Sequence, residues 1–351
     1  MARRKLEEAI LAADELSISE ENSEGHEVYT ELCVRQHVFL SKDSCGIYSV
    51  QFSPDAQHLA VGFGNGAIQV LNAETGEVSS ELSVGHRTRQ AITAMRYYPK
   101  HVNFLVTAGA DGIISAYNTE TERQVVGIKE EENEIHALDF CSDGSVYATA
   151  GKDRHIRLYD SRTSQIVKVF KAPDFKSSDN LTLMSGHTRR IFALRFHPDE
   201  CHVFLTGGWD NSIKIWDKRM EKEARRFING PHICGHGIDV RGSRILTGAW
   251  VAHNALKLWD YRSLRLEKTI PFPLSIGQSE FLYTAQFCNS EVVIAGGSGT
   301  HSAHAINCKT NQDLGGIALG RNTVQAVDSI LDGQLIAVAG VNGNLHIATL
   351  Y

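Results

Sequence analysis

The sequence lacks the motifs and the apolar segments that mark several large classes of protein. No G-x-S-x-G, H-E-x-x-H or G-x-x-x-x-G-K-[ST] motif occurs among its 351 residues, so no nucleophile elbow, zinc-protease helix or phosphate-binding loop is recognisable. No apolar run approaches the length of a membrane-spanning helix, and residues 1–16 lack the uninterrupted apolar core of a signal peptide. We therefore expect a soluble, non-enzymatic protein with no cofactor and no membrane partner.

A positive net charge and paired cysteines are also missing. The chain carries 35 Lys and Arg against 41 Asp and Glu, a formal net charge of −6, which argues against binding nucleic acid by neutralising its phosphates. Its seven cysteines are scattered and lack C-x-x-C spacing, which is typical of a reducing compartment, here the cytoplasm, the nucleus or both. His232, Cys234 and His236 alternate and would share one side of a strand, but no nearby fourth ligand completes a zinc site, so we expect no metal.

The stretch 204–219, which reads FLTGGWDNSIKIWDKR, carries the strongest structural pattern. Two apolar runs flank the turn-forming residues 207–211, and Ile213 and Ile215 alternate with the period of a β-strand, which predicts a strand, a tight turn and a second strand. Upstream, Gly186 and His187 precede a third apolar run at 191–196. A Gly-His, three such strands and a closing Trp-Asp resemble one blade of the WD-repeat β-propeller family.

That resemblance implies a structural role for four residues of this blade. In the family, the equivalents of Asp210, His187, Thr206 and Trp216 form a buried hydrogen-bonded chain that ends at the indole N–H, and a complete network of this kind stiffens a blade. A His, an Asp and a hydroxyl also invite interpretation as a catalytic triad, but a recognised blade motif outweighs a match of residue types without geometry. We expect the four to be structural and none of them to be catalytic.

The same pattern recurs along most of the chain. The Trp-Asp position, or a degraded equivalent, falls at residues 71, 117, 159, 216, 259, 306 and 348, with spacings of 42 to 57 residues that fit the propeller period. We predict an all-β, seven-bladed WD-repeat β-propeller over residues 29–351. The outermost strand of the seventh blade is expected from 29–32 or 36–40, which would pair the N- and C-terminal segments and close the ring.

Two segments fall outside the repeats. Residues 1–28 form an N-terminal extension in which 4–16 suits a short amphipathic helix and 17–27 an acidic, flexible linker. The helix is interpreted either as a docking element for a partner or as a tail packed on the propeller. Residues 172–184 are a polar insertion before the fourth blade, and we expect a surface loop there.

Binding residues are predicted on the face that carries the loops leading into the inner strands. Trp209 precedes the turn Asp of the fourth blade and Trp250 takes the corresponding place in the fifth, so the two would form an aromatic pair on one rim. Arg190 and Lys152 would frame them with charge. The alternative is that one tryptophan packs into a crevice between blades, since large aromatic side chains are mostly buried.

A second candidate surface follows the Trp-Asp positions. The third, fourth and fifth blades each end in Asp-x-Arg, at Arg162, Arg219 and Arg262. The fourth-blade stretch resembles the box of substrate receptors of cullin-4-type ubiquitin ligases, in which that Arg touches the adaptor, and a planar guanidinium suits such a contact. The alternative is that the Arg only braces the turn that follows.

Together these patterns predict a non-enzymatic, intracellular scaffold for protein–protein interactions, a monomeric propeller that works within a hetero-complex. One alternative is a substrate receptor of a cullin-4-type ubiquitin ligase. Another is a structural subunit of a larger assembly, ciliary or chromatin-associated.

Overall fold

The computed structural model describes residues 29–351 except 41–44, 87–89, 174–185, 222 and 342. The chain divides into two compact units, Met1–Thr30 and Glu31–Tyr351. The helix and linker predicted for 1–28 lie outside the described residues, as does most of the insertion at 172–184. In the described part of the chain, no helix has the length and apolarity needed to cross a membrane.

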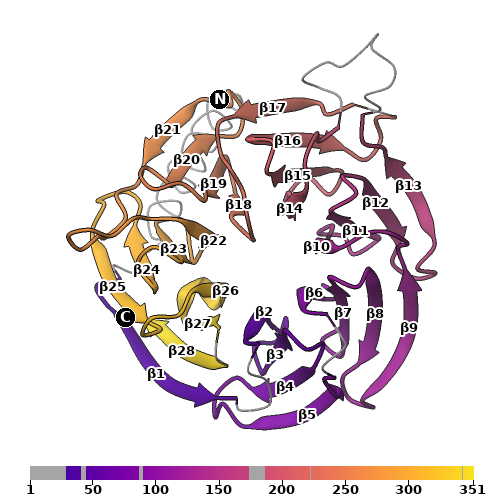
Figure 1. Cartoon of the computed structure of the whole chain (residues 1–351), viewed down its shortest axis with the longest axis horizontal. Helices are drawn as coiled ribbons and strands as arrows, with labels where there is room; N and C mark the ends of the chain where they lie inside the picture. The colour runs from indigo at the N-terminus through magenta and orange to yellow at the C-terminus, as the bar shows by residue number, and fades with distance from the viewer. Residues whose placement is uncertain (1–28, 41–44, 87–89, 174–185, 222, 342) are drawn as a thin grey trace, which may run out of the picture. The chain divides into compact units, whose positions relative to one another are not determined.

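Seven four-stranded antiparallel sheets make up the second unit and surround a common axis (Figure 1). This confirms the predicted seven-bladed β-propeller. Blade one is β2 (Ile47–Phe52), β3 (His58–Phe63), β4 (Ile68–Asn72) and β5 (Val78–Ser83); blade two is β6 (Ile92–Tyr97), β7 (Phe104–Gly109), β8 (Ile113–Asn118) and β9 (Arg123–Lys129); blade three is β10 (Ile135–Phe140), β11 (Val146–Gly151), β12 (Ile156–Asp160) and β13 (Ile166–Phe170).

The remaining blades follow in the same order, and the first-named strand of each is the innermost. Blade four is β14 (Ile191–Phe196), β15 (Val203–Gly208), β16 (Ser212–Asp217) and β17 (Arg226–Asn229); blade five is β18 (Ile238–Arg241), β19 (Arg244–Gly248), β20 (Leu256–Asp260) and β21 (Leu266–Thr269); blade six is β22 (Leu282–Phe287), β23 (Val292–Gly297), β24 (Ser302–Asn307) and β25 (Asp313–Ala318); blade seven is β26 (Val324–Ile330), β27 (Leu335–Gly340), β28 (Asn344–Leu350) and β1 (Leu32–Phe39), with the short 3-10 helix η1 (Leu331–Gly333) between its first two strands.

Blade seven joins the two ends of the propeller. β1 pairs antiparallel with β28 from Leu32 opposite Leu350 to Phe39 opposite Asn344, with a bulge after Val34. A single strand thus occupies the region for which the sequence offered two alternatives. The imidazoles of His37 and His346 stack across this pair with ring centroids 4.3 Å apart. Because the pairing satisfies the backbone groups of β28, that strand is not left as the edge of the sheet.

The core lies between neighbouring sheets, since each sheet packs its faces on the blades beside it. Between blades three and four, Phe170, Phe204 and Trp216 are buried and in ring contact. β15 and β16 are buried at every residue. Close approach of neighbouring blades demands glycine: a Cβ at Gly248 of β19 would lie 2.8 Å from the Cβ of Ala285 on β22 of the next blade. This packing holds the loops at the ends of the strands in fixed positions.

Candidate interaction surface

The four residues that resemble a triad form one continuous hydrogen-bonded chain inside blade four. His187 Nδ1 lies 2.9 Å from Asp210 Oδ2 and His187 Nε2 lies 2.7 Å from Thr206 Oγ1, while Trp216 Nε1 donates to the same hydroxyl at 2.7 Å. Burial acts to raise the pKa of Asp210, but the hydrogen bond and the charge interaction with His187, together with hydrogen bonds from Thr188 and Ser212, outweigh it and lower the pKa to about 2. His187, Thr206 and Trp216 have no exposed surface, so no substrate can reach the hydroxyl, and the geometry is that of a brace.

Trp209 and Trp250 both lie at the protein surface, in connections between the second and third strands of blades four and five. Their exposed fractions are 43% and 38%. They do not form the predicted direct pair: the imidazole of His232 stands between them, with ring centroids 6.5 Å from Trp209 and 6.4 Å from Trp250. The backbone fixes this order, because Trp250 N donates to the His232 carbonyl at 2.8 Å.

Further rings extend this row in both directions around the propeller. Phe192 on β14 contacts Trp209 at 5.1 Å, and Phe281, directly before β22, contacts Trp250 at 4.9 Å. We call the five rings Phe192, Trp209, His232, Trp250 and Phe281 the aromatic surface. Part of it lines a shallow cavity of about 630 Å³ whose other lining residues are Arg189, Cys234 and Tyr283.

Polar contacts hold the aromatic surface rigid and leave it uncharged. Trp209 Nε1 donates to Cys234 Sγ at 3.0 Å, and His232 Nδ1 lies 2.6 Å from Asn211 Oδ1. Burial raises the pKa of the Cys234 thiol to about 11 and lowers the pKa of His232. Both groups are therefore neutral near pH 7, and the surface suits an apolar contact.

Charged groups border the aromatic surface on the side of blade three. Arg190 places its guanidinium 5.7 Å from the Trp209 ring centre, in cation–π range, and donates to Glu134 Oε2 at 2.7 Å. Lys152 forms an ion pair with the other oxygen of Glu134. The hydrogen bond from Lys152 is the main cause of the lowered pKa of Glu134. Arg190 thus lies beside Trp209, and the Glu134 carboxylate joins it to Lys152.

The Asp-x-Arg residues lie in the turns that follow the third strands of their blades. The guanidinium of Arg219 donates to both oxygens of Asp217, at 2.9 and 2.7 Å, and these hydrogen bonds lower the pKa of Asp217 to about 2. The side chain of Arg219 is still 64% exposed. Arg162 and Arg262 are exposed as well, and the Arg262 carbonyl accepts a hydrogen bond from Arg226. Arg219 therefore braces its own turn.

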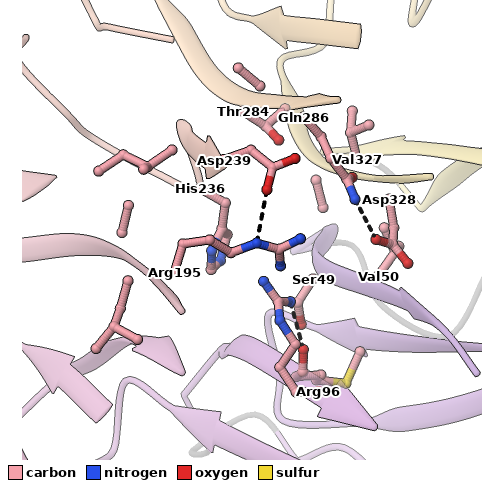
Figure 2. Close-up of a pocket in the computed structure, with 16 residues that line it drawn as sticks. Ser49, Val50, Arg96, Arg195, His236, Asp239, Thr284, Gln286, Val327 and Asp328 are labelled. Carbon is pink, nitrogen blue, oxygen red and sulfur yellow. Dashed lines mark hydrogen bonds and ion pairs between the residues drawn. The ribbon is translucent and has the colours of Figure 1, made fainter. Parts of the chain in front are cut away.

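A ring of polar side chains surrounds the axis, one from the inner strand of each blade. Arg96 Nε donates to Asp139 Oδ1 at 2.8 Å. Arg195 Nε donates to Asp239 Oδ1 at 2.9 Å, as Figure 2 shows. The cavity among them measures only about 40 Å³, room for about one water molecule. The other members are Gln51, Gln286 and Asp328. These partnered groups tie the blades to one another and leave no room for a substrate.

The alternating His-x-Cys-x-His residues do not lie on a strand, and the three side chains do not share one side: His232 and Cys234 line the aromatic cavity, and His236 lines another. They fall in the connection between β17 and β18. His232 belongs to the aromatic surface, whereas His236 lines the axial cavity and hydrogen-bonds to the Thr93 carbonyl at 2.8 Å. Among the residues that the structure describes, no group of three or more His, Cys, Asp and Glu is arranged to hold a metal ion.

Sequence reasoning missed four members of the site. Phe192, His232, Phe281 and Glu134 lie in or beside the connections between blades, where no repeat position marks them. The pattern that could have indicated Phe192 is its place as the second residue of an inner strand, directly after Arg190 and Ile191.

Comparison with known protein families matches three segments of the chain to WD40 repeats. Residues 123–160 and 178–217 match the family described as "WD40: WD domain, G-beta repeat", and residues 18–100 match "Anaphase-promoting complex subunit 4 WD40 domain". The chain is 23% identical to "Cell division cycle 20.1, cofactor of APC complex" of Arabidopsis thaliana, over 65% of this chain and 48% of that protein.

Two further relatives show the same range of similarity. The "WD repeat-containing protein slp1" of Schizosaccharomyces pombe is 23% identical over 69% of this chain and 46% of its own length. "Pre-mRNA-processing factor 19" of Oryza sativa subsp. japonica is 24% identical over 92% of this chain and 58% of its own. The chain thus spans about half the length of the curated relatives it matches.

Proposed function

The chain is a WD-repeat β-propeller, and from this premise we propose that it is a non-enzymatic scaffold that binds a partner protein through the aromatic surface of blades four to six. The observation that carries the proposal is the exposure of two tryptophans, 43% and 38%, in connections held by packed blades. Exposed tryptophans are the residues most enriched in binding hot spots. The relatives named as cofactors of the APC complex support a role within a protein complex.

The rigidity of this surface favours binding. Trp209 and His232 are each held by a side-chain hydrogen bond, and the backbone of Trp209 donates to the Arg190 carbonyl at 3.1 Å. Docking on such a surface loses little conformational entropy, so more of the energy of burying the rings appears as affinity.

The test is capture of partner proteins by the full chain and by single variants. We expect Trp209→Ala and Trp250→Ala each to weaken capture at least about tenfold, the size of a hot-spot truncation. Phe104→Ala is the matched control, because Phe104 is also an aromatic residue with 38% exposure but lies at the start of β7 in blade two. Thermal unfolding of each variant checks the fold. Capture that stays unchanged in both tryptophan variants, with the fold intact, removes the proposal.

The ligase-receptor alternative rests on the exposed side chains of Arg162, Arg219 and Arg262. The pairing of Arg219 with Asp217 supports the bracing interpretation and makes this alternative the weaker one. Capture of a cullin-4 adaptor by wild type and by Arg219→Asp with Arg262→Asp separates the two: loss of adaptor capture in the double variant favours the receptor, and unchanged capture, or none in wild type, removes it. A structural subunit of a larger ciliary or chromatin assembly would use the same aromatic surface, and the captured partners would identify it.

A further inference from the structure

Beside the aromatic surface lies a cavity of about 680 Å³ that is lined almost entirely by cations. Its lining residues are Lys152, Arg154, Thr188, Arg189 and Arg190, from the connections of blades three and four. Arg189 also lines the aromatic cavity, so the two cavities adjoin. Four basic side chains at one place contrast with the formal net charge of −6 of the whole chain. A ligand that reaches both cavities meets an apolar site and a cationic site.

A carboxylate of the protein itself already occupies part of the cationic site. Glu134 accepts from Arg190 at 2.7 Å with one oxygen and pairs with Lys152 through the other, and its side chain remains 32% exposed. Its pKa is lowered, so it is ionised at neutral pH. One carboxylate therefore serves two cations at the rim of the cavity.

Asp153, between the lining residues Lys152 and Arg154 in the sequence, belongs to a paired charge cluster of blade three. Arg157 Nη1 lies 3.0 Å from Glu130 Oε2, and its Nη2 pairs with Asp153. This trio has 15%, 2% and 16% of its side-chain surfaces exposed and bears a net single negative charge. It does not neutralise the four lining cations, so the cavity retains a positive surplus that favours an anionic group.

We propose that the partner segment bound by the aromatic surface carries an Asp or Glu side chain next to its apolar anchor, and that this carboxylate binds among Lys152, Arg189 and Arg190 in competition with Glu134. This inference rests on the proposed function and specifies the chemistry of the partner. A carboxylate is assigned because the arrangement of Lys152 and Arg190 around Glu134 shows that these cations accommodate one. Recognition of acidic segments by basic clusters of this kind is a recurring mode of peptide binding.

The experiment measures fluorescence polarisation of labelled 12-residue peptides on the full chain. Each peptide library has a fixed central Leu or Phe and one flanking position occupied by Glu, Gln, Lys or phosphoserine, the other positions being randomised. We expect wild type to bind the Glu library at least about fivefold more tightly than the Gln library, the upper scale of one ion pair at an exposed site. Raising the salt concentration should narrow the difference, because the surface charges are screened.

Three variants test the individual residues. Lys152→Glu with Arg189→Glu should abolish the preference for Glu over Gln. Glu134→Gln should tighten binding of the Glu library severalfold without changing binding of the Gln library, since it removes the internal competitor; a purely structural role of Glu134 predicts no tighter binding. Arg123→Glu with Arg265→Glu makes the same change in net charge at exposed sites in blades two and five and should leave the preference intact.

The outcomes separate this inference from the proposed function. If Glu and Gln libraries bind equally well while Trp209→Ala still weakens both, the inference falls and the proposed function stands. If binding does not depend on Trp209 or Trp250, the proposed function falls and takes the inference with it. A phosphoserine library that binds tenfold more tightly than the Glu library overturns the carboxylate assignment, and absence of binding by every library overturns the inference for a linear segment.

Discussion

Blades three and four satisfy the same buried positions with different chemistry. In blade four, the imidazole of His187 links Asp210 to the Thr206 hydroxyl. In blade three, the carboxylate of Glu130 takes the place of the imidazole: it accepts from Tyr159 Oη at 2.8 Å and from the Thr149 hydroxyl. Both blades thus place a buried, partnered polar group between the hydroxyl and its neighbours, and the identity of that group can change from an imidazole to a carboxylate.

Blade two has the sequence motif of blade four without its buried histidine. It carries the same Gly-His dipeptide as blade four, at Gly85 and His86, but His86 is exposed while His187 has no exposed surface. The dipeptide alone therefore does not form the network. Substitutions in each blade therefore test how much its buried polar contacts stabilise the propeller.

The largest loss of stability is expected for His187→Ala. The substitution leaves the buried hydroxyl of Thr206 and the carboxylate of Asp210 without their shared partner, which costs about 3–4 kcal/mol of unfolding free energy. Urea unfolding measures it. His86→Ala is the matched control and should change the unfolding free energy by no more than about 0.5 kcal/mol. Equal effects of the two substitutions would show that the blade-four network does not brace the fold.

Glu130→Gln tests the charged network of blade three. The amide keeps the shape of the side chain but removes the charge that faces Arg157. We expect the free energy of unfolding to fall by about 2–3 kcal/mol, and no further because Asp153 still pairs with Arg157. The neighbouring Glu131→Gln is the control, since the Glu131 side chain is 77% exposed and pairs with Lys129 at the surface. If Glu130→Gln lowers the free energy of unfolding no more than Glu131→Gln does, the charge of Glu130 does not stabilise blade three.

A third difference between the two blades should make the stability of the protein depend on pH. The second residue of the inner strand is His136 in blade three and Phe192 in blade four, and the two rings stack 4.5 Å apart. Burial lowers the pKa of His136 to about 4. Because this value lies below the unfolded pKa of about 6.5, the unfolded chain binds more protons, and stability present above pH 6.5 is lost as pH falls towards 4.

His136→Phe should therefore remove part of the acid sensitivity. Between pH 7 and pH 5 the histidine accounts for a loss of about 2 kcal/mol in wild type, which the variant should not show. His236, whose pKa burial also lowers to about 4, contributes in both proteins and sets the remaining slope. The free energy of unfolding is measured for both proteins at several pH values. If it falls by the same amount in wild type and in His136→Phe between pH 7 and pH 5, His136 does not contribute to the acid sensitivity.

The smallest effect is expected in blade five, where the network is shortest. Trp259 Nε1 donates to Thr247 Oγ1 at 2.9 Å, the counterpart of the bond from Trp216 to Thr206. Trp259→Phe should lower the free energy of unfolding by about 1 kcal/mol, the net contribution of one hydrogen bond. Trp216→Phe should cost more, since Thr206 also holds His187. A greater loss in blade five than in blade four would mean that the imidazole adds nothing to the network.

Strand positions could be predicted from the sequence because they follow local rules. The inner strand predicted at 191–196 is β14 (Ile191–Phe196), since apolar residues alternate between turn-forming flanks. The exposure of Trp209 and Trp250 followed from equivalent places in neighbouring blades. His232 and Phe281 could not be predicted in the same way, because they lie in connections whose path depends on how two blades pack together.

The sequence by itself determined the number of blades and the inner strand of most of them, because these depend on period-2 patterning and on the spacing of the repeats. Its resemblance to the WD-repeat family identified the residues that brace blade four. Only the tertiary structure decided that His232 separates the two tryptophans, that Glu134 joins Lys152 to Arg190, and that Glu130 replaces a histidine in blade three. Each of these contacts crosses from one strand connection or one blade to another, and the distance between such residues is set by blade packing, which no local pattern records.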